Sequence, residues 1–169
     1  RFRNHTDRLF KKHRMEPIAY WLPTDGTAKE RRRFIYILKH PSRYAAYKNW
    51  NAFTHDPEWK RDVLEQPEFQ RLLSERPTSI FMTANDYSAK APTLSTKVGG
   101  IYELRTYTAA ENKLNALNTR FANHTKRIFT KHGMSNVGYW TPYDRPESEN
   151  TLIYLIQHES REKADKNWQ

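Results

Sequence analysis

The chain has 169 residues, with 29 Lys or Arg against 19 Asp or Glu, and its formal net charge at pH 7 is +10. This length suffices for one ordinary domain or two small ones, and the ten Tyr, eight Phe and five Trp exclude a disordered polar chain. The lack of cysteine excludes disulfides, thiolate metal sites and thiol nucleophiles, and no apolar run approaches the roughly 20 residues of a membrane-spanning helix.

The basic charge favours contact with nucleic acid, anionic membranes or acidic proteins, but it does not specify a fold. The sequence has no RNP motif, no helix-turn-helix pattern and no zinc-finger spacing. We therefore expect a solvated basic surface. Nucleic acid is not the expected partner, and peripheral contact with an anionic membrane stays open.

An internal repeat dominates the sequence. The opening segment RFRNHTDRLFKKHRM returns at residues 120–134 as RFANHTKRIFTKHGM. The match covers residues 1–23 and 120–142, and after a one-residue change in loop length FIYILKHPSRYAAYKNW (34–50) aligns with LIYLIQHESREKADKNW (152–168). Similarity of this extent indicates two copies of one supersecondary unit.

In chain order, each copy reads as helix, strand, strand, helix. In the first copy, NAFTHDPEWKRDVLEQPEFQRLLSERP then predicts helical turns broken near Pro57 and Pro67, and TSIFMTANDYS predicts a last strand. Asp56 and Pro57 are typical of a helix start, as the N-cap and the first helical residue. Residues 89–98 read as a linker.

The second copy opens with a strand, GGIYELRTYT, which the first copy lacks. A helix with apolar residues at helical spacing follows, and it stops at Gly133. SNVGYWTP and TLIYLIQ predict two strands, and a last helix begins with Ser160 as N-cap. The apolar residues at helical spacing are Leu114, Leu117, Phe121, Ile128 and Phe129.

Laid end to end, a complete unit is strand, helix, strand, strand, helix, strand, the ferredoxin-like βαββαβ arrangement. The expected domains are a first repeat at 1–88 without its opening strand and a second repeat at 99–169 without its closing strand. We expect the sequence to be part of a longer tandem protein; strands supplied by another chain are the alternative.

Several linked motifs resemble the NIPSNAP family: IYELRTYT, HTKRIFTKHGMSNVGYWTP, NTLIYLI with SREKADKNW, and, in the first copy, NAFTHDPEW and NDYS. The resemblance covers nearly the whole chain. It implies an α+β fold whose ferredoxin-like sheets close face to face into an α+β barrel, within one tandem chain or in a dimer. Tandem members of the family are typically mitochondrial, which is the location implied here. The bacterial cytoplasm is the alternative, because the motifs read closer to bacterial members.

One position departs from the repeat. Arg14 stands where the second copy has Gly133. A residue other than glycine is costly in the left-handed conformation that a helix stop often needs, so we expect the first copy to turn differently or to have drifted from the repeat.

Glu103 and Arg105 form the first candidate site. Alternate residues of a strand share a face, so these two lie in one row with Ile101 and Tyr107. Both faces of a barrel sheet are covered, and buried charges are costly unless paired, so we expect the two side chains to interact. Arg105 would then anchor an anionic or carbonyl-bearing ligand, oriented by Glu103, or the two would form a structural ion pair. The structural pair is the favoured interpretation.

Histidines fall on the predicted helices. His124 lies on the apolar stripe that should face the sheet, and His5 takes the same place in the first copy. Such a residue could be an acid–base group or a haem ligand, although a packed, hydrogen-bonded role is favoured. His13 and His132, at helix ends, suit the negative C-terminal dipole.

Two aromatic pairs, Tyr139–Trp140 and Tyr20–Trp21, occupy adjacent strand positions, so one ring of each should face the helices and the other the barrel side. A flat apolar ligand could lie there, although a sheet-to-sheet interface is favoured. The candidate pocket residues are Glu103, Arg105, Tyr107, His124, Tyr139, Trp140, His5, Tyr20 and Trp21.

The sequence has no nucleophile elbow, no glycine-rich phosphate loop and no metal-ligand spacing. We therefore expect no metal and no cofactor, and we favour a non-catalytic interaction protein, such as an accessory subunit of a mitochondrial complex. It would hold protein partners or a second copy through its sheet faces. The alternative is an enzyme or carrier with a small aromatic or carbonyl ligand, or haem, in the barrel pocket, by analogy with monooxygenases of this fold.

Overall fold

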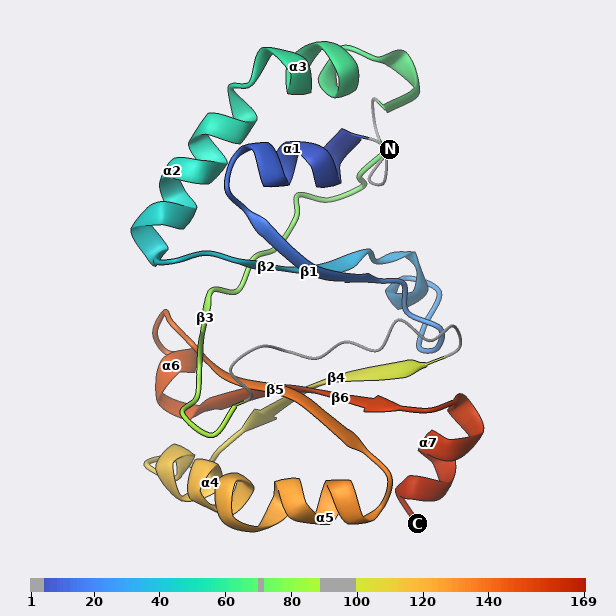
Figure 1. Cartoon of the computed structure of the whole chain (residues 1–169), viewed down its shortest axis with the longest axis vertical. Coiled ribbons are helices and arrows are strands. Elements are labelled where there is room, and N and C mark those ends of the chain that lie inside the picture. Colours follow the sequence, from blue (N-terminus) through green and yellow to red (C-terminus); the bar gives the residue numbers. More distant parts are fainter. Residues whose placement is uncertain (1–4, 70–71, 89–99) are drawn as a thin grey trace. The chain divides into compact units, whose positions relative to one another are not determined.

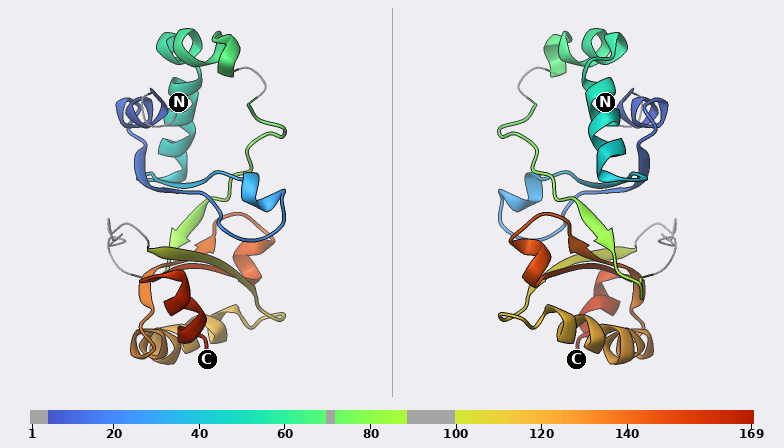
Figure 2. Two further views of the ribbon diagram at one scale, coloured as in Figure 1. Left: turned by 90° about the vertical axis from the view of Figure 1, so that its right-hand side faces the viewer. Right: turned by 90° about the vertical axis from the view of Figure 1, so that its left-hand side faces the viewer.

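The computed structural model describes residues 5–69, 72–88 and 100–169, and the chain divides into two compact units, Arg1–Thr78 and Ser79–Gln169. Each unit combines an antiparallel sheet with helices (Figure 1; two further views in Figure 2). The expected α+β class with ferredoxin-like repeats is thereby confirmed. The predicted linker at 89–98 lies outside the described residues.

The first unit is built on the antiparallel pair β1 (Glu16–Trp21) and β2 (Ile35–Lys39). Helices α1 (Asp7–Lys12) and α2 (Arg43–Thr54) pack on this pair through a core of Leu9, Phe10, Met15 and Phe53. The remaining helical segments are η2 (Glu30–Arg32), α3 (Pro57–Trp59), η3 (Lys60–Leu64) and η4 (Pro67–Phe69).

The second unit has a four-stranded antiparallel sheet in the order β3-β5-β6-β4. Its strands are β3 (Met82–Ala84), β4 (Ile101–Thr108), β5 (Ser135–Pro142) and β6 (Thr151–His158). A continuous helical run, α4 (Leu114–Arg120), η5 (Phe121–Thr125) and α5 (Lys126–Lys131), lies with α7 (Arg161–Asn167) on one face of the sheet (Figure 1). The short helix α6 (Glu147–Asn150) precedes β6.

The core of the second unit lies between that helical run and the sheet. Phe121 and Phe129 from the helices meet Tyr139 and Tyr154 from the two central strands, with Tyr139 and Tyr154 stacked at 5.5 Å between ring centroids. Burial of these large aromatic side chains stabilises the unit, because each removes a large apolar area from water.

Strand β3 belongs to the sheet of the second unit, although its residues follow the first repeat in sequence. Met82 lies opposite Pro142 and Ala84 opposite Trp140, so β3 occupies the outer edge of β5. A sequence pattern indicates that a strand forms but not which sheet edge accepts it, because edge pairing uses backbone groups that every residue carries.

The two repeats end their first helix in the same way. Gly133 adopts φ 78° and Arg14 adopts φ 57°, so both residues are left-handed. The expectation that the first copy turns differently is wrong. In both copies the following Met bonds back into the helix: Met15 N–H to the Phe10 carbonyl and Met134 N–H to the Phe129 carbonyl. These bonds hold the reversal even where the left-handed residue is arginine.

Candidate functional site

The side chains of Glu103 and Arg105 meet on β4, as expected from their spacing. Arg105 Nη1 lies 2.9 Å from Glu103 Oε2, and the two side chains are 36% and 25% exposed. β4 is an edge strand of the sheet, with Glu103 opposite Ile156 and Arg105 opposite Tyr154 of β6. The pair therefore lies at the edge of the helix-covered face, partly open to solvent.

Three residues from the C-terminal part of the chain complete this site. The Trp168 indole nitrogen donates to Glu103 Oε1 at 2.8 Å, and His158 Nε2 lies 3.1 Å from the same oxygen. His158 is completely buried at the end of β6, and its Nδ1 lies 3.1 Å from the Asn167 side-chain amide. We call these five residues, Glu103, Arg105, His158, Asn167 and Trp168, the Glu103 cluster.

Aromatic rings fix the Arg105 guanidinium. It lies 4.6 Å from the ring centroid of Trp168 and 5.8 Å from that of Tyr107. Both distances are within the range of cation–π attraction. The guanidinium is therefore held by an ion pair and by a ring on which it stacks, which leaves it little freedom to reorganise around a ligand.

The hydrogen bonds of Glu103 determine its charge state. Burial opposes its ionisation, but the bonds from Trp168 and Arg105 outweigh this effect and lower its pKa below the ordinary value. Glu103 is therefore ionised at neutral pH, with both oxygens in contact with neighbouring groups. Such a carboxylate is suited to anchoring its neighbours and poorly suited to removing a proton from a substrate.

His124 was expected to face the sheet, but it is exposed to solvent. The expected orientation is therefore wrong. The reason is the π-helical segment η5, which widens the helix at Phe121–Thr125. A wider turn contains more residues, so a three-residue step from buried Phe121 no longer returns to the same face. Ile128, which was placed on the same stripe, is 49% exposed for the same reason.

The aromatic pair of β5 has its two rings on opposite sides of the strand. Tyr139 is buried in the core, its hydroxyl donates to Asn136, and burial raises its pKa. Trp140 folds over Gly138, where an added Cβ would lie 2.3 Å from the indole. Tyr139 is enclosed by the rings of its neighbours and does not reach the Glu103 cluster. Of the other candidates in this unit, Tyr107 lies in one row with Glu103 and Arg105 on β4.

The remaining candidates, His5, Tyr20 and Trp21, belong to the first unit. Tyr20 packs against its core and donates a 2.8 Å hydrogen bond to Asp7 Oδ1. His5 is half-buried in the helical turn before α1. The hydrogen bond from Tyr20 to Asp7 joins β1 to α1.

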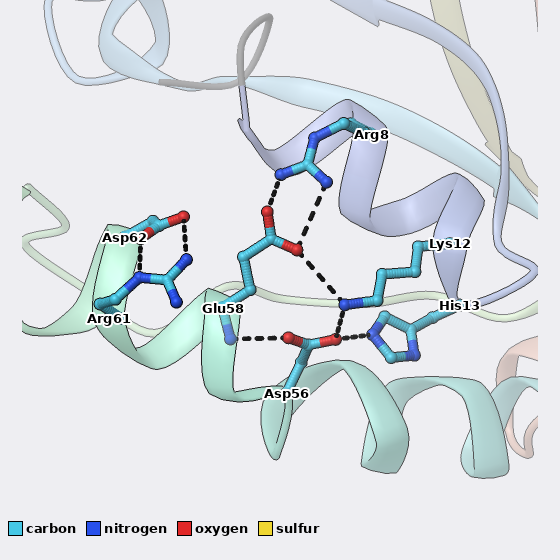
Figure 3. A network of polar contacts seen from close by, with 7 residues as sticks. All are labelled: Arg8, Lys12, His13, Asp56, Glu58, Arg61 and Asp62. Atoms are coloured by element: carbon cyan, nitrogen blue, oxygen red, sulfur yellow. Dashed lines mark hydrogen bonds and ion pairs between the residues drawn. The ribbon is translucent and has the colours of Figure 1, made fainter.

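A second polar network holds the helices of the first unit together (Figure 3). Asp56 caps α3 by accepting from the Glu58 backbone N–H at 2.8 Å, with Pro57 in the first turn, which confirms the predicted helix start. The same buried carboxylate meets Lys12 Nζ at 2.8 Å and His13 Nε2 at 2.6 Å. The bond from Lys12 lowers the pKa of Asp56 despite the opposing effect of burial.

Two shallow surface hollows of about 400 and 310 Å³ lie along the start of the second unit's helical run. The larger is lined by Asn112, Leu114, Asn115, Asn118 and Glu149. None of the candidate pocket residues lines either hollow. Within the described ranges, no group of three His, Asp or Glu side chains is placed to hold a metal ion, and no helix is long and apolar enough to cross a membrane.

Sequence reasoning missed His158 and Trp168, although a signal was present. Both lie in the second half of the repeat and are identical in the two copies, as His40 and His158 and as Trp50 and Trp168. A histidine and a tryptophan retained ten positions apart in both copies indicate a shared structural task. Their link to Glu103 could not be read from spacing, because the contact to Trp168 spans 65 positions.

The fold and the Glu103 cluster define a class: an α+β protein built from duplicated ferredoxin-like repeats, with a tightly paired charged cluster at the sheet edge of the second unit. The family model of NIPSNAP matches residues 1–88 and 102–169. The chain therefore belongs to the NIPSNAP family, as the resemblance indicated. Searches of curated proteins and of solved structures returned no significant match. Family membership points to a binding or non-catalytic role.

Proposed function

We propose that this chain is a non-catalytic interaction protein that acts as an accessory subunit or docking partner in a larger assembly. The observation that carries the proposal is the Glu103–Arg105 pair, in which Arg105 is held by the carboxylate at 2.9 Å and by the Trp168 ring at 4.6 Å. A guanidinium committed to these contacts stabilises the sheet edge. Catalysis would need a group free to exchange protons or charge with a substrate.

The surface supports a role in assembly. Several large apolar or aromatic side chains are exposed, including Tyr44 and Tyr47 at 70% and 69% on α2. Exposed tyrosines beside basic residues are typical of interaction surfaces, and the net charge of +10 favours acidic partners. Mitochondria are the proposed location, on the strength of the tandem arrangement of the repeats.

A carrier role for a small anionic or carbonyl ligand is the second candidate. It is favoured by one observation: the Arg105 side chain is 36% exposed, so part of this side chain still reaches solvent. A ligand there would have to share Arg105 with Glu103, because the ion pair is already formed.

Native mass spectrometry of the protein purified from its own source, without added ligand, separates the two candidates. Co-purifying protein subunits and no small molecule would support assembly. A bound small molecule that is lost in Arg105→Ala, while the fold is retained by circular dichroism, would overturn that proposal in favour of the carrier. Fractionation of the source cells tests the mitochondrial location directly.

A further inference from the structure

Helix α2 presents aromatic and basic side chains together to solvent. Tyr44 and Tyr47 are 70% and 69% exposed, and Lys48 beside them is exposed as well. These residues are three and four positions apart, so they lie on one side of the helix, while Ala46 and Phe53 are buried on the other. The helix contains no Asp or Glu. We call Tyr44, Tyr47 and Lys48 the α2 face.

The equivalent helix of the second repeat, α7, neutralises its own charge. Lys166 Nζ lies 2.7 Å from Glu162 Oε1, and Arg161 Nε lies 3.3 Å from Asp165 Oδ1. Each pair is four residues apart, which places its members one above the other on the helix surface. The carboxylates that balance the basic residues of α7 therefore come from α7 itself.

The first repeat keeps the lysine and replaces the acids. Tyr44 and Tyr47 stand at the positions of the two α7 carboxylates, and Lys48 stands at the position of the α7 lysine. Lys48 Nζ lies 5.6 Å from the ring centroid of Tyr44, and no acidic side chain of the described residues pairs with it. The carboxylates at the start of α3, Asp56 and Glu58, are already paired with residues of α1.

The exposure of this side of the helix is common to both repeats. In the second unit, where β4 and α4 precede the helix, the Glu162 and Asp165 side chains are 78% and 63% exposed. In the first unit, where α3 and η3 follow the helix, the two tyrosines are exposed to a similar degree. None of the described elements before or after this helix in the repeat covers this side, so a partner can reach it.

We propose that the α2 face binds an acidic segment of a partner protein, which supplies from outside the carboxylates that α7 supplies for itself. One carboxylate would pair with Lys48, and the rings of Tyr44 and Tyr47 would pack on apolar side chains beside it, with their hydroxyl groups as further donors. A carboxylate is favoured over a phosphate, because α7 carries carboxylates at the same positions. The net charge of +10 favours the same partner. The inference rests on the proposed interaction function and names a contact surface and the chemistry of its partner.

The probe is a fluorescein-labelled peptide, acetyl-GDEFDELFDEG-amide, in which carboxylates alternate with apolar side chains. We expect saturable binding to the 169-residue chain, measured by fluorescence anisotropy, that weakens as salt is added. The same peptide with Asn for Asp and Gln for Glu should bind about tenfold more weakly, the effect of losing one hydrogen bond to a charged group.

Tyr47→Glu is the decisive protein variant, because it introduces an acid where α7 already carries one and should repel the peptide. We expect binding to weaken about tenfold or more. Tyr143→Glu is the matched control, since this tyrosine is 58% exposed after β5 and its substitution changes the net charge equally. Circular dichroism of both variants shows that they fold.

A second variant tests the ammonium group separately. Lys48→Gln should weaken binding and make it less sensitive to salt, because it removes the cation that pairs with the peptide. Lys163→Gln is the control, as an exposed lysine on α7. Equal effects of these two substitutions would reduce the contact to general charge attraction and overturn the inference.

Four further results would overturn it. The first is no saturable binding of the peptide, and the second is equal weakening by Tyr47→Glu and Tyr143→Glu. The third is tighter binding, with the same dependence on Tyr47, of a thymidine oligonucleotide or of phosphatidylglycerol vesicles, which would assign the face to nucleic acid or to a membrane. The fourth is a dimer that Tyr47→Glu dissociates in sedimentation velocity, which would assign it to a second copy.

Native mass spectrometry distinguishes failure of this inference from failure of the proposed function. Protein subunits that co-purify equally with the wild type and with Tyr47→Glu would sustain the assembly role and remove the α2 face from it. Peptide binding that depends on Tyr47, in a protein that co-purifies with no subunit, would sustain the acidic-segment site and contradict the accessory-subunit role.

Discussion

The Trp168 indole donates a 2.8 Å hydrogen bond to Glu103, which lies 65 positions earlier in the chain. This contact joins α7, at the C-terminal end of the second unit, to the edge strand β4. Because the same carboxylate also contacts Arg105 and His158, one side chain links three elements. Loss of the carboxylate should therefore affect the whole sheet edge.

Glu103→Ala is expected to lower the free energy of unfolding by about 1–3 kcal/mol, because it leaves buried His158 without its acceptor. Urea denaturation followed by circular dichroism measures the change. His124→Ala is the control, since an exposed residue on η5 should change stability by less than about 0.5 kcal/mol. Equal effects of the two substitutions would contradict the role assigned to Glu103.

The two left-handed helix stops provide a reciprocal pair of substitutions. Gly133→Ala should destabilise the second unit by about 1 kcal/mol, because φ 78° is unfavourable for a residue with a Cβ. An added Cβ would also come within 3.4 Å of the Asn167 side chain. Arg14→Gly should stabilise the first unit by up to about 1 kcal/mol, because it removes the same penalty. Thermal unfolding by calorimetry measures both, and a stabilising Gly133→Ala would refute the explanation.

Asp56→Asn tests the charge of the helix cap separately from its geometry, since asparagine also caps helices well. The folded pKa of Asp56 lies below its ordinary value of 3.8, so its ion pairs stabilise the protein above that pH. This contribution is lost as the pH falls through the folded pKa. The difference in unfolding free energy between the wild type and Asp56→Asn should therefore be largest near neutral pH and shrink below about pH 4.

The matched control for that series is Asp165→Asn, on the exposed side of α7, where the carboxylate pairs only at the surface. Its pH profile should parallel that of the wild type. A difference between wild type and Asp56→Asn that stays constant from pH 7 to pH 2 would show that the cap geometry, and not the charge, carries the effect.

Gly138 allows the close approach of Trp140 on β5. A methyl group at this position would lie 2.3 Å from the indole, so Gly138→Ala must displace the ring. We expect a changed tryptophan emission and a loss of about 1–3 kcal/mol in unfolding free energy, the usual cost of overpacking. In a protein that already carries Trp140→Leu, Gly138→Ala should lower the unfolding free energy much less, because the indole that the added methyl group would meet is absent. Additive effects would show that the two residues are not coupled.

The duplicated α+β architecture could be predicted from the sequence alone, because strand and helix patterns and caps depend on residues close together in the chain. The ion pair of Glu103 and Arg105 follows from the two-residue period of one strand, and the Asp56–Pro57 helix start follows from local capping. The family was also readable, because its motifs are contiguous.

Three other features became visible only in the folded structure. The π-helical turn η5 turned His124 to solvent, since the backbone widened where the sequence pattern assumed a regular helix. Strand β3 pairs with β5 in the sheet of the second unit. This pairing could not be predicted from the sequence, because it uses backbone groups that every residue carries. His158 and Trp168 reached Glu103 only through the order of strands in the sheet, which sets contacts between residues far apart in the chain.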